Sequence, residues 1–245
     1  MQRCIADNKI PYILLSTDSY CPVHKQHITF LEKIKNFLEK TQKIEVIGCY
    51  ISPSHDFYLM DKASRKGFLE FLMPFEDRCN LIEKSMKFID EDVGLVVDKW
   101  EGSQEYFIDF PEVWGSMKYF FDEICREKNL QTEIQVAYCI GDDMLYPTID
   151  HENLKFDDKT YNLPLVIVQR RGKNYKGTII EQRINTYSKM SHQEMLEKKI
   201  FYVCVEENDI SSSDFREKFS REAPEQELNK LVHPSVTQYY KEKLK

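Results

Sequence analysis

Short apolar segments of the kind that form buried β-strands recur along the chain and alternate with segments of helical pattern. The strand-like segments are residues 12–15, 44–51, 93–97, 134–140, 163–168 and 200–205. Most of them are continuously apolar, which is typical of parallel strands covered on both faces. Apolar residues at helical spacing lie over residues 27–38, 75–89, 113–128, 212–222 and 235–244. This alternation predicts a Rossmann-like α/β fold, a doubly wound and mostly parallel sheet with helices on both faces.

The length of the chain suits one large α/β domain. With 245 residues, 42% of them hydrophobic, a single domain can bury most of its apolar side chains in one core. We therefore expect residues 1–245 to form one domain. The least regular part lies around residues 146–195, where the polar stretches 146–160 and 172–193 are typical of loops or a small insertion. Residues 212–245 are expected to add C-terminal helices.

The charge and the cysteines limit the partners and the compartment. Asp and Glu number 41 against 34 Lys and Arg, and the net charge of −7 argues against binding to nucleic acid or to an anionic membrane. We expect no signal peptide and no membrane span, because the first residues are polar and the apolar stretches are short. The seven cysteines are scattered without a CxxC pair or zinc-site spacing, which is typical of a reducing compartment, the cytoplasm or the nucleus.

The first candidate site follows the first predicted strand, where a loop containing Pro22 leads into a helix. Ligands of open α/β sheets bind at the carboxyl ends of strands, and backbone N–H groups at a helix start favour phosphate. His24 and His27 are three residues apart, so both project from one face of the first helical turn. Two imidazoles there can donate hydrogen bonds to phosphate oxygens, although a surface helix can carry the same short pattern without that role.

Three serines begin a helix after the last predicted strand. Ser211 and Asp214 approximate a capping box. The hydroxyls of Ser211 and Ser212 suit phosphate oxygens, and Arg216 lies about one turn further on, within reach of the same phosphates. The alternative is that these serines only cap the helix.

Two further strand ends carry residues suited to a ligand. Trp100 follows the third strand-like segment among polar neighbours, where an indole can stack on a flat ring, although a tryptophan is more often part of the core. Gly141 follows the fourth segment and allows close approach of a ligand, and Asp143 can accept from ribose hydroxyls. The same residues also suit a plain turn, or a metal held by Asp142 and Asp143. The common location after a strand is more specific than any one signal.

Five motifs carry a resemblance to a known family. Residues 18–27 are similar to GxFxPxHxxH, residues 210–216 to ISSTxxR, residues 141–143 to GxD, residues 100–104 to Trp-Glu-x-x-Gln, and residues 51–58 to ISPxxDxY. In these motifs the chain resembles the nucleotidyltransferase α/β-phosphodiesterase superfamily. Within it, the chain is similar to the nicotinamide/nicotinate mononucleotide adenylyltransferases of eukaryotic type.

The resemblance implies a reaction and a set of site residues. AMP would pass from ATP to nicotinamide or nicotinate mononucleotide, giving NAD or deamido-NAD and pyrophosphate, with Mg²⁺ bound mainly through the ATP phosphates. The implied catalytic residues are His24, His27 and Arg216; those for ATP are Ser211, Ser212, Gly141 and Asp143; those for the mononucleotide are Ser19, Tyr20, Lys62 and Trp100, with Arg78 in support.

The chain also departs from the family pattern. Asp18 stands where the first motif has glycine, so we expect its side chain to crowd a ligand and its charge to lie beside anionic substrates. The second aromatic stacking residue of the family has no clear counterpart after Leu154. Two alternatives stay open: a related nucleotidyltransferase acting on another phosphorylated small molecule, and a weakly active relative that serves as a binding or chaperone-like protein. The choice between amide and acid mononucleotide and the association into a homo-oligomer are also left open.

Overall fold

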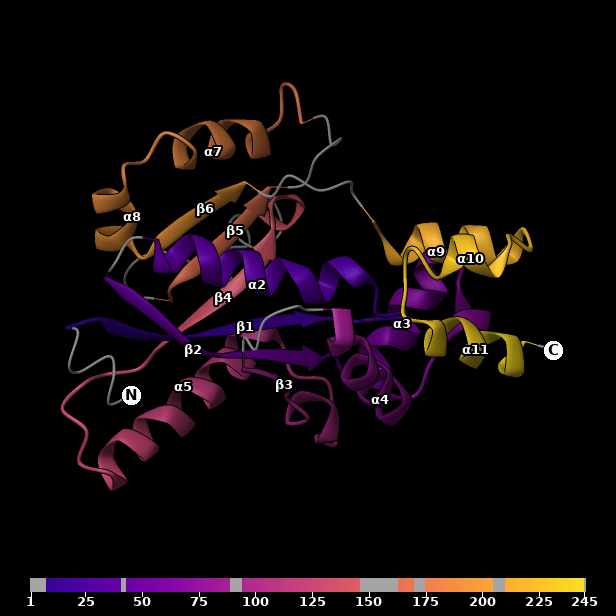
Figure 1. The fold of residues 1–245 in the computed structure, drawn as a ribbon, viewed down its shortest axis with the longest axis horizontal. Coiled ribbons are helices and arrows are strands. Elements are labelled where there is room, and N and C mark those ends of the chain that lie inside the picture. Colours follow the sequence, from indigo (N-terminus) through magenta and orange to yellow (C-terminus); the bar gives the residue numbers. More distant parts are fainter. Residues whose placement is uncertain are drawn as a thin grey trace. The chain divides into compact units, whose positions relative to one another are not determined.

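A six-stranded sheet is the framework of the fold, as seen in a computed structural model that describes residues 8–40, 43–88, 94–145, 163–169, 175–204 and 210–244 (Figure 1). The strands are β1 (Ile10–Asp18), β2 (Ile44–Pro53), β3 (Leu95–Val97), β4 (Gln135–Gly141), β5 (Leu165–Gln169) and β6 (Ile200–Cys204). Their order in the sheet is β3-β2-β1-β4-β5-β6, and every pairing given by the described residues is parallel. This is the strand order of a Rossmann fold, so the predicted fold class is confirmed.

Nine helices are described, and five of them lie in the segments where helical spacing predicts them. The helices are α2 (Lys25–Glu39), α3 (Asp56–Lys66), α4 (Phe75–Ser85), α5 (Phe110–Glu127), α7 (Ile179–Tyr187), α8 (His192–Lys198), α9 (Ser212–Ser220), α10 (Glu225–Leu228) and α11 (Pro234–Lys243). The predicted C-terminal helices over 212–245 are therefore present as α9, α10 and α11. Within the described residues, no helix is both long and apolar enough to cross a bilayer.

The expectation of loops over residues 172–193 needs a correction. Helix α7 and the start of α8 lie there, each begun by a side-chain cap. Thr178 accepts a hydrogen bond from the backbone of Glu181, and Ser191 and Glu194 form a capping box. Met195 is the buried residue of α8, so little apolar periodicity marks this helix in the sequence. Capping, not burial, is the local signal for these two helices.

The described chain forms two compact units. The first comprises residues 1–16, 33–47 and 117–209, and the second comprises residues 17–32, 48–116 and 210–245. In the first unit the parallel strands form the core, where Tyr12 of β1 meets Phe201 of β6 edge-on with ring centroids 5.9 Å apart. The single domain expected over residues 1–245 stays a prediction.

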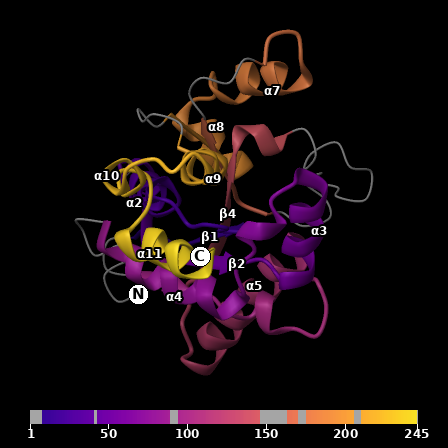
Figure 2. The ribbon, with the colours of Figure 1, turned by 90° about the vertical axis from the view of Figure 1, so that its right-hand side faces the viewer.

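The second unit has an aromatic core. Phe71, Phe215, Phe219 and Tyr240 lie with ring centroids 5.5–6.0 Å apart. Aromatic rings at such separations contribute beyond the area that they bury. The Tyr240 hydroxyl donates to the backbone oxygen of Phe71 at 2.9 Å. Helix α11 also contacts α4, and the two helices lie side by side in Figure 2. These contacts hold the C-terminal helices against the segment that follows α3.

Candidate active site

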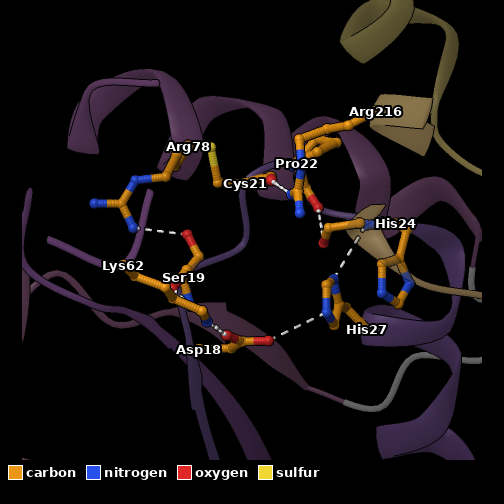
Figure 3. A network of polar contacts seen from close by, with 10 residues as sticks. Asp18, Ser19, Cys21, Pro22, His24, His27, Lys62, Arg78 and Arg216 are labelled. Atoms are coloured by element: carbon orange, nitrogen blue, oxygen red, sulfur yellow. Dashed lines mark hydrogen bonds and ion pairs between the residues drawn. The ribbon is translucent and has the colours of Figure 1, made fainter. Parts of the chain in front are cut away.

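The loop between β1 and α2 carries the first predicted site (Figure 3). His24 lies just before α2 and not in its first turn as predicted, yet its ring stacks on that of His27 with centroids 3.4 Å apart, and both are buried. His27 Nδ1 accepts a hydrogen bond from the backbone N–H of His24 at 3.1 Å. An accepting Nδ1 assigns the ring proton of a neutral imidazole to Nε2. His27 therefore presents Nε2–H to the site.

Asp18 lies at the end of β1 and is surrounded by hydrogen-bond donors. Its Oδ1 lies 3.1 Å from Lys62 Nζ and 2.6 Å from the backbone nitrogen of Ser19, and its Oδ2 lies 3.5 Å from His27 Nε2. Burial raises the pKa of this carboxyl, but Lys62, His27 and the Ser19 N–H together hold it well below its ordinary value. The charge of Asp18 is therefore compensated by Lys62, which the sequence separates from it by 44 positions.

Lys62 and Ser19 lie side by side. Lys62 Nζ donates to Ser19 Oγ at 2.8 Å. Burial lowers the pKa of Lys62, but the carboxylate of Asp18 outweighs it and the pKa is raised above its ordinary value. Lys62 therefore stays a cation near neutral pH.

Arg78 links three segments of the second unit. It is fully buried on α4 and donates to the backbone oxygens of Ser19 at 2.9 Å and Ser54 at 2.6 Å. It also donates to Asp56 Oδ1 at 2.7 Å. The resemblance of the motifs implied only a supporting role for Arg78. Its position on the same helical face as Cys79 and Ile82, which are both buried, is the signal that marks it as a buried structural cation.

The start of α9 is tied to the loop after β1. Ser212 Oγ donates to the backbone oxygen of Pro22 at 2.9 Å, and Arg216 donates to that of Cys21 at 2.6 Å. The Arg216 guanidinium also lies 4.0 Å from the ring centroid of Phe68. Ser211 caps α9 in a capping box with Asp214, as its spacing predicts. Ser212 and Arg216 are thus brought to the same loop as the two histidines.

Local hydrogen bonds close the turn that contains Trp100. Its backbone oxygen accepts from Gln104 Nε2 at 2.8 Å, and its backbone nitrogen donates to Asp98 at 3.2 Å. A Cβ atom on Gly102 would lie 1.9 Å from the ring of Phe75, so this turn requires glycine. The indole of Trp100 is 36% exposed, which leaves ring surface available to a ligand. The glutamine of the Trp-Glu-x-x-Gln motif therefore shapes the turn.

Glu101, beside Trp100, is a buried acid that gives the protein a pH-dependent stability. Burial raises its pKa from 4.5 to about 8, against smaller opposing effects of the His55 N–H, Arg78 and Ser52. The folded protein then keeps a proton between these pH values that the unfolded chain has released, so the free energy of unfolding falls as pH rises through this window. When the pH is raised from 6 to 7, we expect the free energy of unfolding of wild type to fall by about 1 kcal/mol more than that of Glu101→Gln.

Urea unfolding at the two pH values measures this difference. Glu105→Gln is the matched control, because Glu105 is exposed in the same segment, and it should follow wild type. If the free energy of unfolding of Glu101→Gln changes with pH as much as that of wild type, the buried acid is not the source of this pH dependence.

Three further predicted site residues are either covered or part of the other unit. Tyr20 is 1% exposed and packs edge-on against His27 with centroids 4.9 Å apart, so its side chain supports the imidazole. Gly141 and Asp143 belong to the first unit, at the end of β4. Asp142 between them is buried and accepts from the Tyr175 hydroxyl at 2.9 Å, so it forms part of the interior of that unit. Leu154 lies outside the described residues.

Comparisons with known proteins point to one family. A family model described as Cytidylyltransferase-like matches residues 19–218. Zebrafish (Danio rerio) nicotinamide/nicotinic acid mononucleotide adenylyltransferase 2 is 33% identical over 99 residues, which cover 40% of this chain and 29% of the relative. The corresponding enzyme 1 of yeast (Saccharomyces cerevisiae) is 23% identical over 255 residues, which cover 98% of this chain and 57% of the relative. The chain thus spans only part of the length of these relatives.

Solved structures resemble the whole described fold. Plasmodium falciparum nicotinic acid mononucleotide adenylyltransferase complexed with APC aligns with a TM-score of 0.56 at 15% identity, covering 93% of each chain. The same protein complexed with NaAD aligns with a TM-score of 0.56, covering 94% of each chain. At this identity the similarity establishes the fold, and the chemistry has to be argued from the side chains.

Proposed function

The chain belongs to the cytidylyltransferase-like family, and we propose that it transfers AMP from ATP to the phosphate of nicotinamide or nicotinate mononucleotide. The products would be NAD or deamido-NAD and pyrophosphate. The names of the zebrafish and yeast relatives and of the structural neighbours support this choice of substrate. The observation that carries it is that cationic side chains able to donate hydrogen bonds to phosphate lie together at the β1–α2 loop. Lys62 binds the carboxylate of Asp18 there, and Arg216 binds the backbone oxygen of Cys21.

The proposed reaction is a direct displacement at the α-phosphorus of ATP. An oxygen of the mononucleotide phosphate forms the new P–O bond, and the bond to the β-phosphate oxygen breaks with its electron pair leaving on pyrophosphate. No covalent enzyme intermediate is needed, so the protein acts by positioning and by stabilising charge. His27 Nε2–H would donate to an oxygen of the transferring phosphate. His24, Ser211, Ser212 and Arg216 would hold the other two phosphates.

The remaining assignments follow the position of each side chain. Lys62 and Ser19, 2.8 Å apart, would bind the mononucleotide phosphate. Trp100 would stack on the pyridine ring with its exposed face, and Tyr20 would support His27. In the first unit, Gly141 and Asp143 would contact the adenosine.

Magnesium is proposed to enter with ATP. In the parts of the chain that the structure describes, no group of three or more His, Cys, Asp or Glu side chains could hold a metal ion. Mg²⁺ commonly keeps phosphate oxygens and water as ligands, so we propose that the ATP phosphates would carry most of its coordination. The ion would neutralise charge on the pyrophosphate leaving group.

We propose one nucleotidyltransferase domain over residues 1–245, acting on small molecules and not on nucleic acid or membranes. The scattered cysteines support a reducing compartment, the cytoplasm or the nucleus.

A direct assay tests the proposal. Purified protein is incubated with ATP, Mg²⁺ and each mononucleotide in turn, and the dinucleotide is separated by chromatography. We expect NAD or deamido-NAD with stoichiometric pyrophosphate, and the ratio of the two rates gives the preference for amide or acid. A folded protein that makes neither product would contradict the proposal.

A second candidate is a nucleotidyltransferase that takes another nucleotide or acceptor. The description of the matching family as cytidylyltransferase-like favours it. Replacing ATP by CTP in the same assay, and the mononucleotide by other phosphorylated small molecules, separates the two. Product with CTP alone would favour the second candidate.

A further inference from the structure

We propose that Asp18 determines how tightly the site binds phosphate, because its carboxylate occupies donors that a phosphate group would use. Three N–H groups converge on it: those of the Ser19 backbone at 2.6 Å, Lys62 Nζ at 3.1 Å and His27 Nε2 at 3.5 Å (Figure 3). A carboxylate is an anion that accepts through several oxygen lone pairs, as a phosphate does. The inference rests on the proposed function only in taking the ligand to be a phosphate-bearing substrate.

The donors cannot all serve both anions at once. Since His27 Nδ1 accepts from the His24 N–H, the proton of the neutral ring is the one on Nε2, which faces Asp18. The Ser19 N–H is a single donor and is also directed at Asp18. Lys62 has three N–H groups, and Asp18 and Ser19 accept from it. A phosphate oxygen that accepts from His27 Nε2–H or from the Ser19 N–H therefore has to displace the carboxylate.

Asp18 can give way without a change in the loop. Its side chain is 38% exposed, compared with 23% for Lys62 and 10% for His27, so it can turn toward water while the donors stay in place. Arg78 holds the backbone oxygen of Ser19 at 2.9 Å, which fixes the chain beside it. Rotation of the Asp18 side chain would then release the three N–H donors that face its carboxylate.

The carboxylate competes as a charged group. Burial raises the pKa of Asp18, but the opposite effect of its three neighbours is larger, so the pKa stays low and the group is ionised near neutral pH. An ionised carboxylate both shields Lys62 and repels an incoming phosphate. The glycine of the motif that residues 18–27 resemble would do neither. Asp18 therefore lowers the affinity for phosphate in this chain compared with a chain that has a neutral residue at this position.

Calorimetric titration with inorganic phosphate, which carries the chemical group that Lys62 and Ser19 are proposed to bind, tests this without any turnover. The full chain is used at low salt and neutral pH, as wild type, Asp18→Asn and Asp18→Gly. We expect both variants to bind inorganic phosphate about tenfold more tightly, the scale of removing one unit charge close to the ligand. The gain should shrink with added salt. Asp61→Asn on α3 is the matched control, because it removes the same charge from an exposed side chain and should leave binding unchanged.

A second arm asks whether the gain depends on the released donors. In a Lys62→Met background, Asp18→Asn should improve binding much less than it does with Lys62 present. Circular dichroism confirms that each variant is folded, and either Asp18 variant suffices for the test.

The outcomes separate this inference from the proposed function. Unchanged or weaker binding of inorganic phosphate in the folded Asp18 variants would overturn the inference, since Asp18 would then orient the donors. Tighter binding together with an absence of dinucleotide synthesis would support the inference and count against the proposed function.

Discussion

Replacing Arg78 with leucine is expected to lower the free energy of unfolding by about 2–4 kcal/mol, the scale of leaving buried polar groups without partners. Leucine removes the donors to the backbone oxygens of Ser19 and Ser54, at 2.9 and 2.6 Å. The guanidinium is completely buried, so water does not replace it readily. Asp56, the third partner, is 48% exposed and can turn to solvent, which is why the expected cost lies below that of breaking a fully buried ion pair.

Urea unfolding followed by circular dichroism measures this loss. Arg65→Leu is the matched control, because Arg65 pairs with Asp61 on the surface of α3 and both side chains are exposed. Its effect should be too small to resolve. Arg78→Lys keeps the charge but loses the planar guanidinium group. Its loss of free energy of unfolding should therefore lie between those of Arg78→Leu and Arg65→Leu. If Arg78→Leu unfolds like Arg65→Leu, the three segments are not held together by Arg78.

Replacing His27 with alanine is expected to lower kcat/KM for dinucleotide synthesis about 10²- to 10³-fold, which is the effect of removing one preorganised donor to developing negative charge. His27 Nε2–H is the donor at issue, and the imidazole is fixed by its contacts with His24 and Tyr20. A fixed donor stabilises a transition state without having to reorganise during the reaction. The cost should therefore fall on kcat more than on the binding of ATP.

Initial rates at varied ATP and mononucleotide test this, with thermal unfolding as the check on folding. His192→Ala is the matched control, since His192 lies at the exposed start of α8 in the first unit and should leave the rates unchanged. A loss of less than about threefold in His27→Ala would remove His27 from the role of charge-stabilising donor.

Much of the fold and part of the site could be predicted because the signals are local. Each of the strand-like segments overlaps a strand, and the spacing of His24 and His27 brings their rings together. The capping box of Ser211 and Asp214 also forms as its spacing predicts. These features depend on residues a few positions apart, where helix and strand geometry alone sets the relative positions.

The features that were missed involve contacts between distant positions or helices with weak apolar patterns. Helix α3 carries Phe57 and Met60 on its exposed side, so its apolar residues do not mark its buried face. Tyr20 was assigned to the mononucleotide from the motif, and its packing against His27 could not be predicted from that motif. Asp18 was expected to place a negative charge beside anionic substrates, and nothing in the sequence indicated that Lys62 would lie 3.1 Å from it, which it does because α3 follows β2 and returns to the loop after β1.

The sequence by itself determined the alternation of strands and helices, the parallel sheet and the residue types at each strand end, since these follow from periodicity and local spacing. Tertiary structure decided how those residues are paired. It joined Asp18 to Lys62, buried Arg78 between three chain segments and placed Glu101 where burial raises its pKa to about 8. The physical reason is that burial and charge pairing depend on distances in space between residues that the chain separates by many positions.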